Sequence, residues 1–111
     1  KLLSEAKTQQ ERKVLLAGKV EDMINTVVRQ IAFYDFECKL HAARAEGELT
    51  PDQINEIWMS VQGESLGPVF EFMDGYETFW SYIPHFVHSP FYVYAYAFGD
   101  GLVNALYAIY E

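Results

Sequence analysis

Two imidazoles and three phenols fall close together in this sequence, and their types could do chemistry: His85, His88, Tyr92, Tyr94 and Tyr96. No carboxylate, lysine or arginine lies among them. Imidazole and phenol groups are neutral hydrogen-bond donors near pH 7, and active sites use such donors to hold a peptide carbonyl or a developing oxyanion. Because no nucleophile, metal-ligand set or phosphate-binding loop accompanies them, the segment has the composition of half an active site.

Three interpretations of the two histidines remain open: zinc ligands, structural histidines at a helix entry, or donors that face a substrate. A zinc site needs a further ligand, and Glu77 and Asp100 lie at unrelated spacing. On one helix, Tyr92 and Tyr96 share a face and Tyr94 lies opposite. Buried tyrosines are by default packing residues, so Tyr92, nearest the expected helix start, is the best functional candidate of the three.

A second pair of interest is Glu37 and His41, four residues apart. Such a pair could chelate a metal if a further ligand came from elsewhere, but the spacing is also typical of a solvated helix contact. The only cysteine, Cys38, excludes an internal disulfide and is typical of a reducing cytoplasm. It has no neighbouring cation to activate it, so we interpret it as inert.

The charge distribution argues against two classes of partner. All eight Lys and Arg residues lie at or before Arg44, and the net charge is -8. Nucleic-acid binding needs clustered cations, and residues 46–111 have none. The most apolar stretch, residues 91–110, is interrupted by Gly99, Asp100, Gly101 and Asn104, so no run reaches the roughly 18 to 20 apolar residues of a membrane span. We expect no nucleic acid, no membrane and a cytoplasmic location.

The elements that must position these side chains are predicted to be all α-helical, about five in number. Residues 1–7 have the pattern of the end of a helix. Thr8 and Glu11 form a capping-box signal, which predicts a helix start at Gln9. Beyond Gly18 the apolar residues recur at spacings of three and four: Val20, Met23, Ile24, Val27, Val28 and Ile31. The helix that these residues form beyond Gly18 is predicted to continue to Glu46. Its length of about 25 residues, or roughly 38 Å, is too long for this chain alone to cover.

Further along the chain, Thr50 and Pro51 predict a helix start. That helix is expected to stop near Gly63, before an irregular connection over residues 63–75 and a short helix over 76–85 with Trp80 and Ile83 inward. Ser89 as N-cap and Pro90 as first residue predict the last helix. Its apolar residues cover every face, which indicates burial on all sides, and a five-helix chain cannot hide it without help.

Four segments occur in order along nearly the whole chain: residues 28–37 (VRQIAFYDFE), 47–50 (GELT), 83–86 (IPHF) and 90–99 (PFYVYAYAFG). Together they resemble the C-terminal part of oligoendopeptidase F, a thimet oligopeptidase-like zinc metallopeptidase. Members of that family are α-helical, with a deep channel that admits short peptides. They carry His-Glu-x-x-His on one helix and a glutamate ligand on the next; the histidines bind zinc and the intervening glutamate activates the attacking water.

The resemblance implies that residues 1–111 are the C-terminal helical part of a cytoplasmic zinc metalloendopeptidase domain. This sequence has no His-Glu-x-x-His, so zinc is expected in the parent enzyme with no ligand from this chain. His85 and Tyr92 resemble the family's substrate-binding and oxyanion-stabilising pair, with His88, Tyr94 and Tyr96 as second choices for substrate binding.

The same resemblance sets the expected partners, which are oligopeptide substrates and the remainder of the parent domain. The isolated chain is expected to be inactive and to associate with itself or another fragment through exposed apolar surface. The alternative is a non-catalytic helical interaction or self-assembly module.

Overall fold

The computed structural model describes residues 2–110 and contains helices and no strand within them. The four long helices are α2 (Gln9–Met23), α3 (Arg29–Glu46), α4 (Pro51–Leu66) and α6 (Tyr94–Tyr110). The shorter elements are α1 (Leu2–Glu5), α5 (His85–His88), a π-helix η1 (Ile24–Val28) and 3-10 helices η2 (Gly67–Val69) and η3 (Tyr76–Tyr82). The all-α prediction is confirmed. The helix end predicted within residues 1–7 is found as α1, which stops at Glu5, and Lys1 lies outside the described residues.

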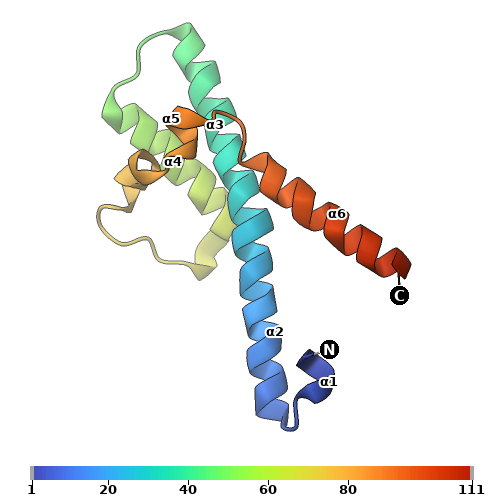
Figure 1. The fold of residues 1–111 in the computed structure, drawn as a ribbon. Helices are drawn as coiled ribbons and strands as arrows, with labels where there is room; N and C mark the ends of the chain where they lie inside the picture. The colour runs from blue at the N-terminus through green and yellow to red at the C-terminus, as the bar shows by residue number, and fades with distance from the viewer. Residues whose placement is uncertain (1, 111) are drawn as a thin grey trace.

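Helices α2, η1 and α3 follow one another without a break and form a rod (Figure 1). Its start at Gln9 is confirmed: the Glu11 N–H donates to Thr8 Oγ1 at 3.1 Å, and the Thr8 N–H donates to Glu11 Oε2 at 3.2 Å. At about 1.5 Å rise per residue the rod is roughly 57 Å long. That length accounts for the longest dimension of the molecule, 57 Å.

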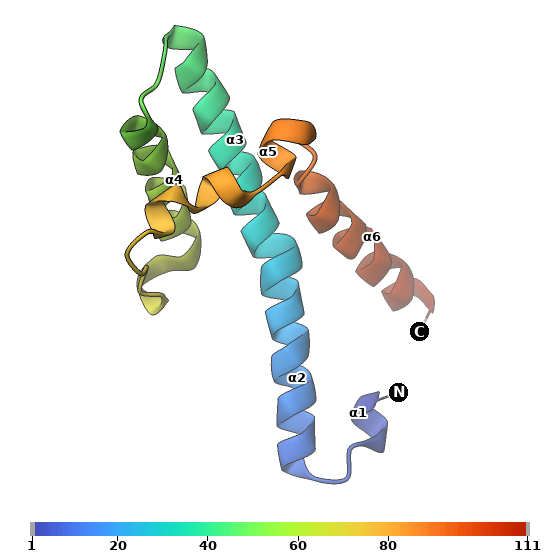
Figure 2. The ribbon, with the colours of Figure 1, turned by 60° about the vertical axis from the view of Figure 1, so that its left-hand side comes forward.

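Helix α4 packs back along α3, as Figures 1 and 2 show. The Thr50 cap is confirmed, since the Thr50 N–H donates to Gln53 Oε1 at 2.8 Å and the Gln53 N–H donates to Thr50 Oγ1 at 3.3 Å. The expected stop near Gly63 is wrong, because α4 continues to Leu66. The helix ends instead at Gly67, whose φ of 59° lies in the left-handed region that favours glycine.

The hydrophobic core lies where α3, α4 and the chain after η3 meet, and it is mostly aromatic. Its buried residues are Ala32, Phe33, Phe36, Trp58, Val61, Ile83 and Val93. Trp58 is fully buried; its ring centroid lies 5.2 Å from that of Phe36 and 5.5 Å from that of Phe33. The inward orientation expected of Ile83 is confirmed, and the half-buried Trp80 donates its indole N–H to Asn55 Oδ1 at 2.7 Å.

The rod extends beyond this core, and its first half is uncovered. No residue of α2 is buried, and Val20 and Ile31, on the predicted apolar stripe, are 54% and 52% exposed. The expectation that the chain alone cannot cover this helix is therefore confirmed.

The last helix starts later than predicted. Ser89 is not its N-cap but follows the end of α5, and α6 begins at Tyr94. The reason is Phe91, whose φ of 61° is left-handed and breaks the helix; its N–H donates to Glu37 Oε1 on α3 at 2.8 Å. A left-handed conformation costs a non-glycine residue about 1–2 kcal/mol, so this turn depends on contacts from elsewhere.

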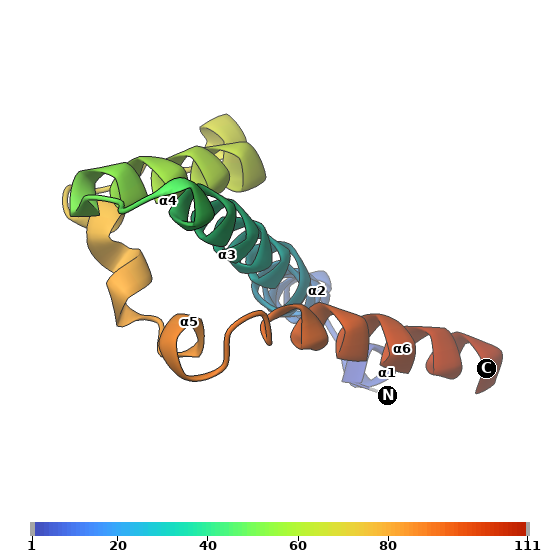
Figure 3. The same ribbon diagram turned by 90° about the horizontal axis from the view of Figure 1, so that it is seen from above.

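Helix α6 runs away from α4 along the other side of the rod (Figures 1 and 3). None of its described residues is buried, which confirms that this chain cannot hide the helix without help; its burial on all sides stays a prediction. Phe98, for example, is 67% exposed. The chain supplies too few other helices to enclose it, so its apolar side chains face outward. Across residues 2–110, no helix combines the length and hydropathy that a bilayer crossing requires.

Candidate functional site

Three of the five predicted site residues come together, and we name them the His–Tyr cluster: His85, Tyr92 and Tyr96. His85 Nε2 lies 3.0 Å from the Tyr96 hydroxyl oxygen, within hydrogen-bond distance. The Tyr92 ring is parallel to the His85 ring, with centroids 6.4 Å apart and an angle of 6°. The Tyr92 and Tyr96 rings meet edge to face at 5.7 Å.

The starts of two helices, α5 and α6, position the cluster. His85 opens α5, directly after the buried Ile83. Tyr96 stands in the first turn of α6, and the fully buried Val93 anchors the chain between the two tyrosines. Because Ile83 and Val93 both belong to the core, the polar side chains beside them are held on a fixed surface rather than on a free loop.

The cluster is open to solvent and neutral in composition. Tyr92 is 52% exposed and Tyr96 is 40% exposed. In the hydrogen bond between His85 and Tyr96, either the imidazole or the phenol donates, depending on the histidine tautomer. In both arrangements the Tyr92 hydroxyl makes no hydrogen bond to any residue from 2 to 110. The arrangement can therefore offer a phenol O–H donor to an acceptor such as a carbonyl oxygen.

The other two predicted residues lie apart from the cluster. His88 is exposed at the end of α5. Tyr94 packs on Tyr34 of α3, with ring centroids 5.7 Å apart. A hydrogen bond with the Cys38 thiol raises the pKa of the Tyr34 phenol. The predicted separation of Tyr94 from Tyr92 and Tyr96 is thus confirmed.

Glu37 is the residue that the sequence interpretation placed wrongly. Its spacing from His41 indicates a solvated helix contact, but Glu37 has no exposed surface. Its Oε1 accepts the Phe91 N–H, and its buried Oε2 has no hydrogen-bond partner within residues 2–110. The signal that could have found it is its spacing of four residues from Phe33, which places both on the buried face of α3.

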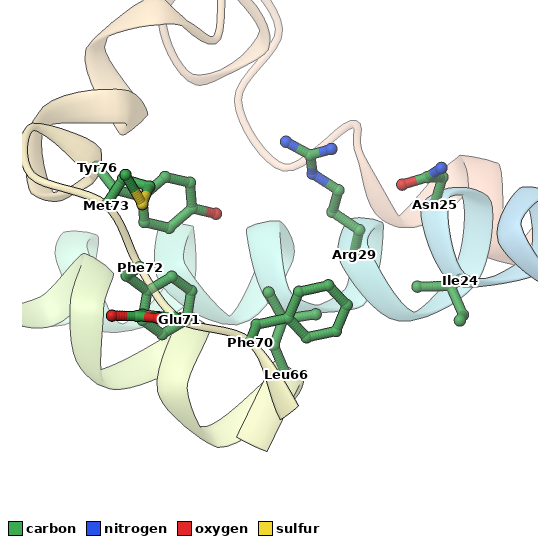
Figure 4. Close-up of a pocket in the computed structure, with 9 residues that line it drawn as sticks. All are labelled: Ile24, Asn25, Arg29, Leu66, Phe70, Glu71, Phe72, Met73 and Tyr76. Atoms are coloured by element: carbon green, nitrogen blue, oxygen red, sulfur yellow. The ribbon is translucent and has the colours of Figure 1, made fainter. Parts of the chain in front are cut away.

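A concave pocket of about 300 Å³ lies beside the π-helix (Figure 4). Arg29 and Asn25 reach into it from the rod, and Phe70, Phe72 and Met73 line it from the segment after α4. The Arg29 guanidinium also lies 5.4 Å from the centre of the Phe33 ring, a cation–π distance. The pocket shares no residue with the His–Tyr cluster, so the two sites are separate.

The residues present do not fit a zinc ion. No group of three or more His, Cys, Asp or Glu side chains converges anywhere in residues 2–110. The pair His85 and His88 does not converge, because His85 bonds Tyr96 and His88 is exposed. In the pair Glu37 and His41, one Glu37 carboxylate oxygen accepts the Phe91 N–H. Residues 2–110 therefore do not form a metal site by themselves.

Comparison with known proteins identifies the family. The model of "Peptidase family M3" matches residues 1–109. Oligopeptidase PepF of Bacillus subtilis is 34% identical over 108 residues, which cover 95% of this chain and 16% of that protein. The plasmid oligoendopeptidase F of Lactococcus lactis subsp. cremoris is 35% identical over 99 residues, 88% of this chain and 16% of that protein.

A third relative, group B oligopeptidase PepB of Streptococcus agalactiae, is 31% identical over 106 residues and is covered to 18% of its length. The chain thus spans less than a fifth of the length of these curated relatives. No solved structure matches it. Because the family model extends over nearly every residue, in agreement with the all-helical fold, the chain belongs to peptidase family M3.

Proposed function

We propose that residues 1–111 form the C-terminal helical part of the catalytic domain of a cytoplasmic zinc metalloendopeptidase that hydrolyses short oligopeptides. In this proposal His85 and Tyr92 bind the peptide and donate hydrogen bonds to the oxyanion that develops on the scissile carbonyl. Tyr96 supports His85, and His88 and Tyr94 contact the substrate further along. The observation that carries the proposal is the His–Tyr cluster within a chain of family M3.

The geometry favours Tyr92 as the donor. Tyr92 is half exposed, and its hydroxyl makes no hydrogen bond to the described residues, whereas His85 already has Tyr96 as a partner. Donors that are fixed before the reaction stabilise a developing oxyanion without reorganising during it. The Tyr92 ring lies parallel to the His85 ring and edge to face with the Tyr96 ring, and these two contacts support a fixed donor.

In this proposal the zinc is held by residues of the parent enzyme outside this chain, and residues 2–110 bring together no group of three ligand side chains. When bound, zinc supplies Lewis-acid chemistry to peptide hydrolysis. The role proposed for the present chain is confined to binding and orienting the peptide and to donating hydrogen bonds. On its own, this chain is expected to hydrolyse nothing.

The test is Tyr92→Phe in an enzyme that contains both this chain and a His-Glu-x-x-His motif. Loss of one oxyanion donor typically lowers kcat by about 10²- to 10³-fold, and we expect KM to change little. Tyr110→Phe is the matched control, since Tyr110 is 86% exposed at the end of α6. A Tyr92→Phe enzyme with the parental kcat would refute the role proposed for this hydroxyl.

A second candidate, a non-catalytic interaction or self-assembly module, is favoured by one observation. Helix α6 leaves its apolar residues exposed, and its Leu106 and Val103 are 58% and 64% exposed. Sedimentation of the purified chain tests self-assembly through this helix. The coding sequence before Lys1 separates the two candidates, because a His-Glu-x-x-His motif there supports the peptidase and a start codon supports the module.

A further inference from the structure

Glu37 is a carboxylate with no exposed surface at the edge of an aromatic core. A charged group buried in this way is unfavourable unless it is well paired. Here only Oε1 is bonded, to the Phe91 N–H at 2.8 Å, and Oε2 has no partner among residues 2–110. An apolar side chain would fill the same space without the desolvation cost of a carboxylate, so packing alone does not explain a glutamate at this position.

What the carboxylate holds is an unusual backbone. Phe91 is the one described non-glycine residue with a positive φ, 61°. Helix α3 makes two contacts with this residue. Glu37 accepts the Phe91 N–H, and one turn later the centroid of the His41 ring lies 4.7 Å from that of the Phe91 ring. The two contacts come from residues 54 and 50 positions away in the sequence, so the turn is fixed by α3 and not by its neighbours.

The direction of the chain at Phe91 decides where Tyr92 goes. With φ in the ordinary negative region, the chain would leave Phe91 along a different path, and the Tyr92 ring could not stay parallel to His85. Figure 2 shows this connection between α5 and α6 passing beside α3. We infer that Glu37 is a positioning residue: its carboxylate keeps Phe91 left-handed and thereby sets Tyr92 against His85.

For its catalytic consequence this inference rests on the function proposed above, but the positioning itself can be measured without activity. The chain offers a matched control in Gln62, which is 1% exposed and also has one unpartnered polar atom, Nε2. Gln62 Oε1 accepts the Tyr76 hydroxyl at 3.1 Å on α4, away from the Phe91 turn. Glu37→Met and Gln62→Met therefore remove comparable buried hydrogen bonds, and only the first should affect Tyr92.

The first experiment uses NMR on the 111-residue chain. Hydrogen bonds to charged groups are stronger than neutral ones, so in Glu37→Met we expect the Phe91 amide to exchange about 10- to 100-fold faster. We also expect the nuclear Overhauser contacts between the His85 and Tyr92 rings to disappear. Glu37→Gln retains an acceptor, so its Phe91 amide should exchange at a rate between those of the parent and of Glu37→Met. This variant keeps the test usable if Glu37→Met does not fold. Gln62→Met should leave both signals unchanged.

The second experiment measures kinetics in the enzyme with the zinc motif. Glu37→Met should lower kcat by about 10²-fold, as expected for a catalytic group displaced by roughly 1 Å, with KM little changed. Combined with Tyr92→Phe it should add almost nothing, because both act through one hydroxyl. Glu37→Gln should recover most of kcat, and Gln62→Met should keep kcat within a few-fold.

Three results would overturn the inference. One is a folded Glu37→Met chain with unchanged Phe91 exchange and ring contacts. Another is loss of those contacts with no fall in kcat, in an enzyme that Tyr92→Phe does impair. The third is full additivity of the two substitutions. If Tyr92→Phe alone leaves kcat unchanged, the proposed role of Tyr92 fails, and the NMR measurements still decide whether Glu37 positions the turn.

Discussion

The two capping boxes of this chain allow a matched test of where its cooperative core ends. Thr8 and Thr50 each cap a long helix with near-identical geometry, their hydroxyl oxygens accepting an N–H at 3.1 and 3.3 Å. Replacing such a threonine with alanine typically costs the helix about 1 kcal/mol. The two helices differ in what they bury, since α4 carries Trp58 and Val61 in the core and α2 buries nothing.

Thr50→Ala should therefore lower the free energy of unfolding of the core by about 1 kcal/mol, which is a fall of about 4 °C in Tm for a chain of this size. Thr8→Ala should fray α2 and leave the core transition within about 1 °C of the parent. Tryptophan fluorescence follows the core alone, because Trp58 and Trp80 both lie there. Circular dichroism follows every helix and should show the loss from α2 at lower temperature.

Ser60→Ala is the control, since Ser60 is exposed within α4 and caps nothing. It should raise Tm slightly through helix propensity. If Thr8→Ala lowered the fluorescence midpoint as far as Thr50→Ala does, α2 would belong to the same cooperative unit as the core. The reasoning from burial would then be refuted.

Trp58→Phe removes the indole N–H that donates to the Tyr76 carbonyl at 3.0 Å; urea titration should show a loss of about 1–3 kcal/mol, and no loss would contradict the assigned bond. Burial raises the pKa of the Tyr76 phenol, so its contribution to stability is complete below pH ~10. That contribution is lost as the pH rises through the raised pKa of Tyr76 in the folded state. A spectroscopic phenolate titration should therefore show alkaline unfolding as Tyr76 ionises. Lys39 lies 2.8 Å from Asp35 and 3.4 Å from Glu64, and the hydrogen bond with Asp35 raises its pKa. Because these groups are exposed, Lys39→Met should cost less than about 1 kcal/mol, and the cost should vanish in about 1 M salt. The contribution of the Lys39 ion pairs to the free energy of unfolding should be complete below pH ~10.4 and should be lost as the pH rises through the raised pKa of Lys39.

Local signals in the sequence correctly predicted the starts of α2 and α4. The boxes at Thr8 and Thr50 are correct because each cap is made within four residues by its own side chains. The end of α4 was misplaced because Gly63 and Gly67 carry the same signal, and only Gly67 adopts a left-handed φ. The resemblance to oligoendopeptidase F also held, since it rests on residue identity and not on tertiary contacts.

Features that depend on distant contacts could not be predicted. Ser89 and Pro90 have the composition of a helix start, but the Phe91 backbone is bonded to Glu37, 54 residues earlier. The same distant contact buries Glu37, whose spacing from His41 indicates a solvated pair. The catalytic roles of His85 and Tyr92 stay predictions, because they require a peptide and a metal that these residues do not provide.

The π-helix η1 has a consequence for the surface of the rod. Its Arg29 N–H donates to the Ile24 carbonyl, five residues back, so the rod contains one residue more than a regular α-helix would at this point. One added residue turns everything that follows by about 100° around the axis. Val20 and Phe36 are sixteen residues apart, which a regular helix would place about 160° apart around the axis, and the added residue reduces that angle to about 60°. The π-helix therefore turns the exposed Val20 toward the side of the rod on which Phe36 packs against Trp58 of α4.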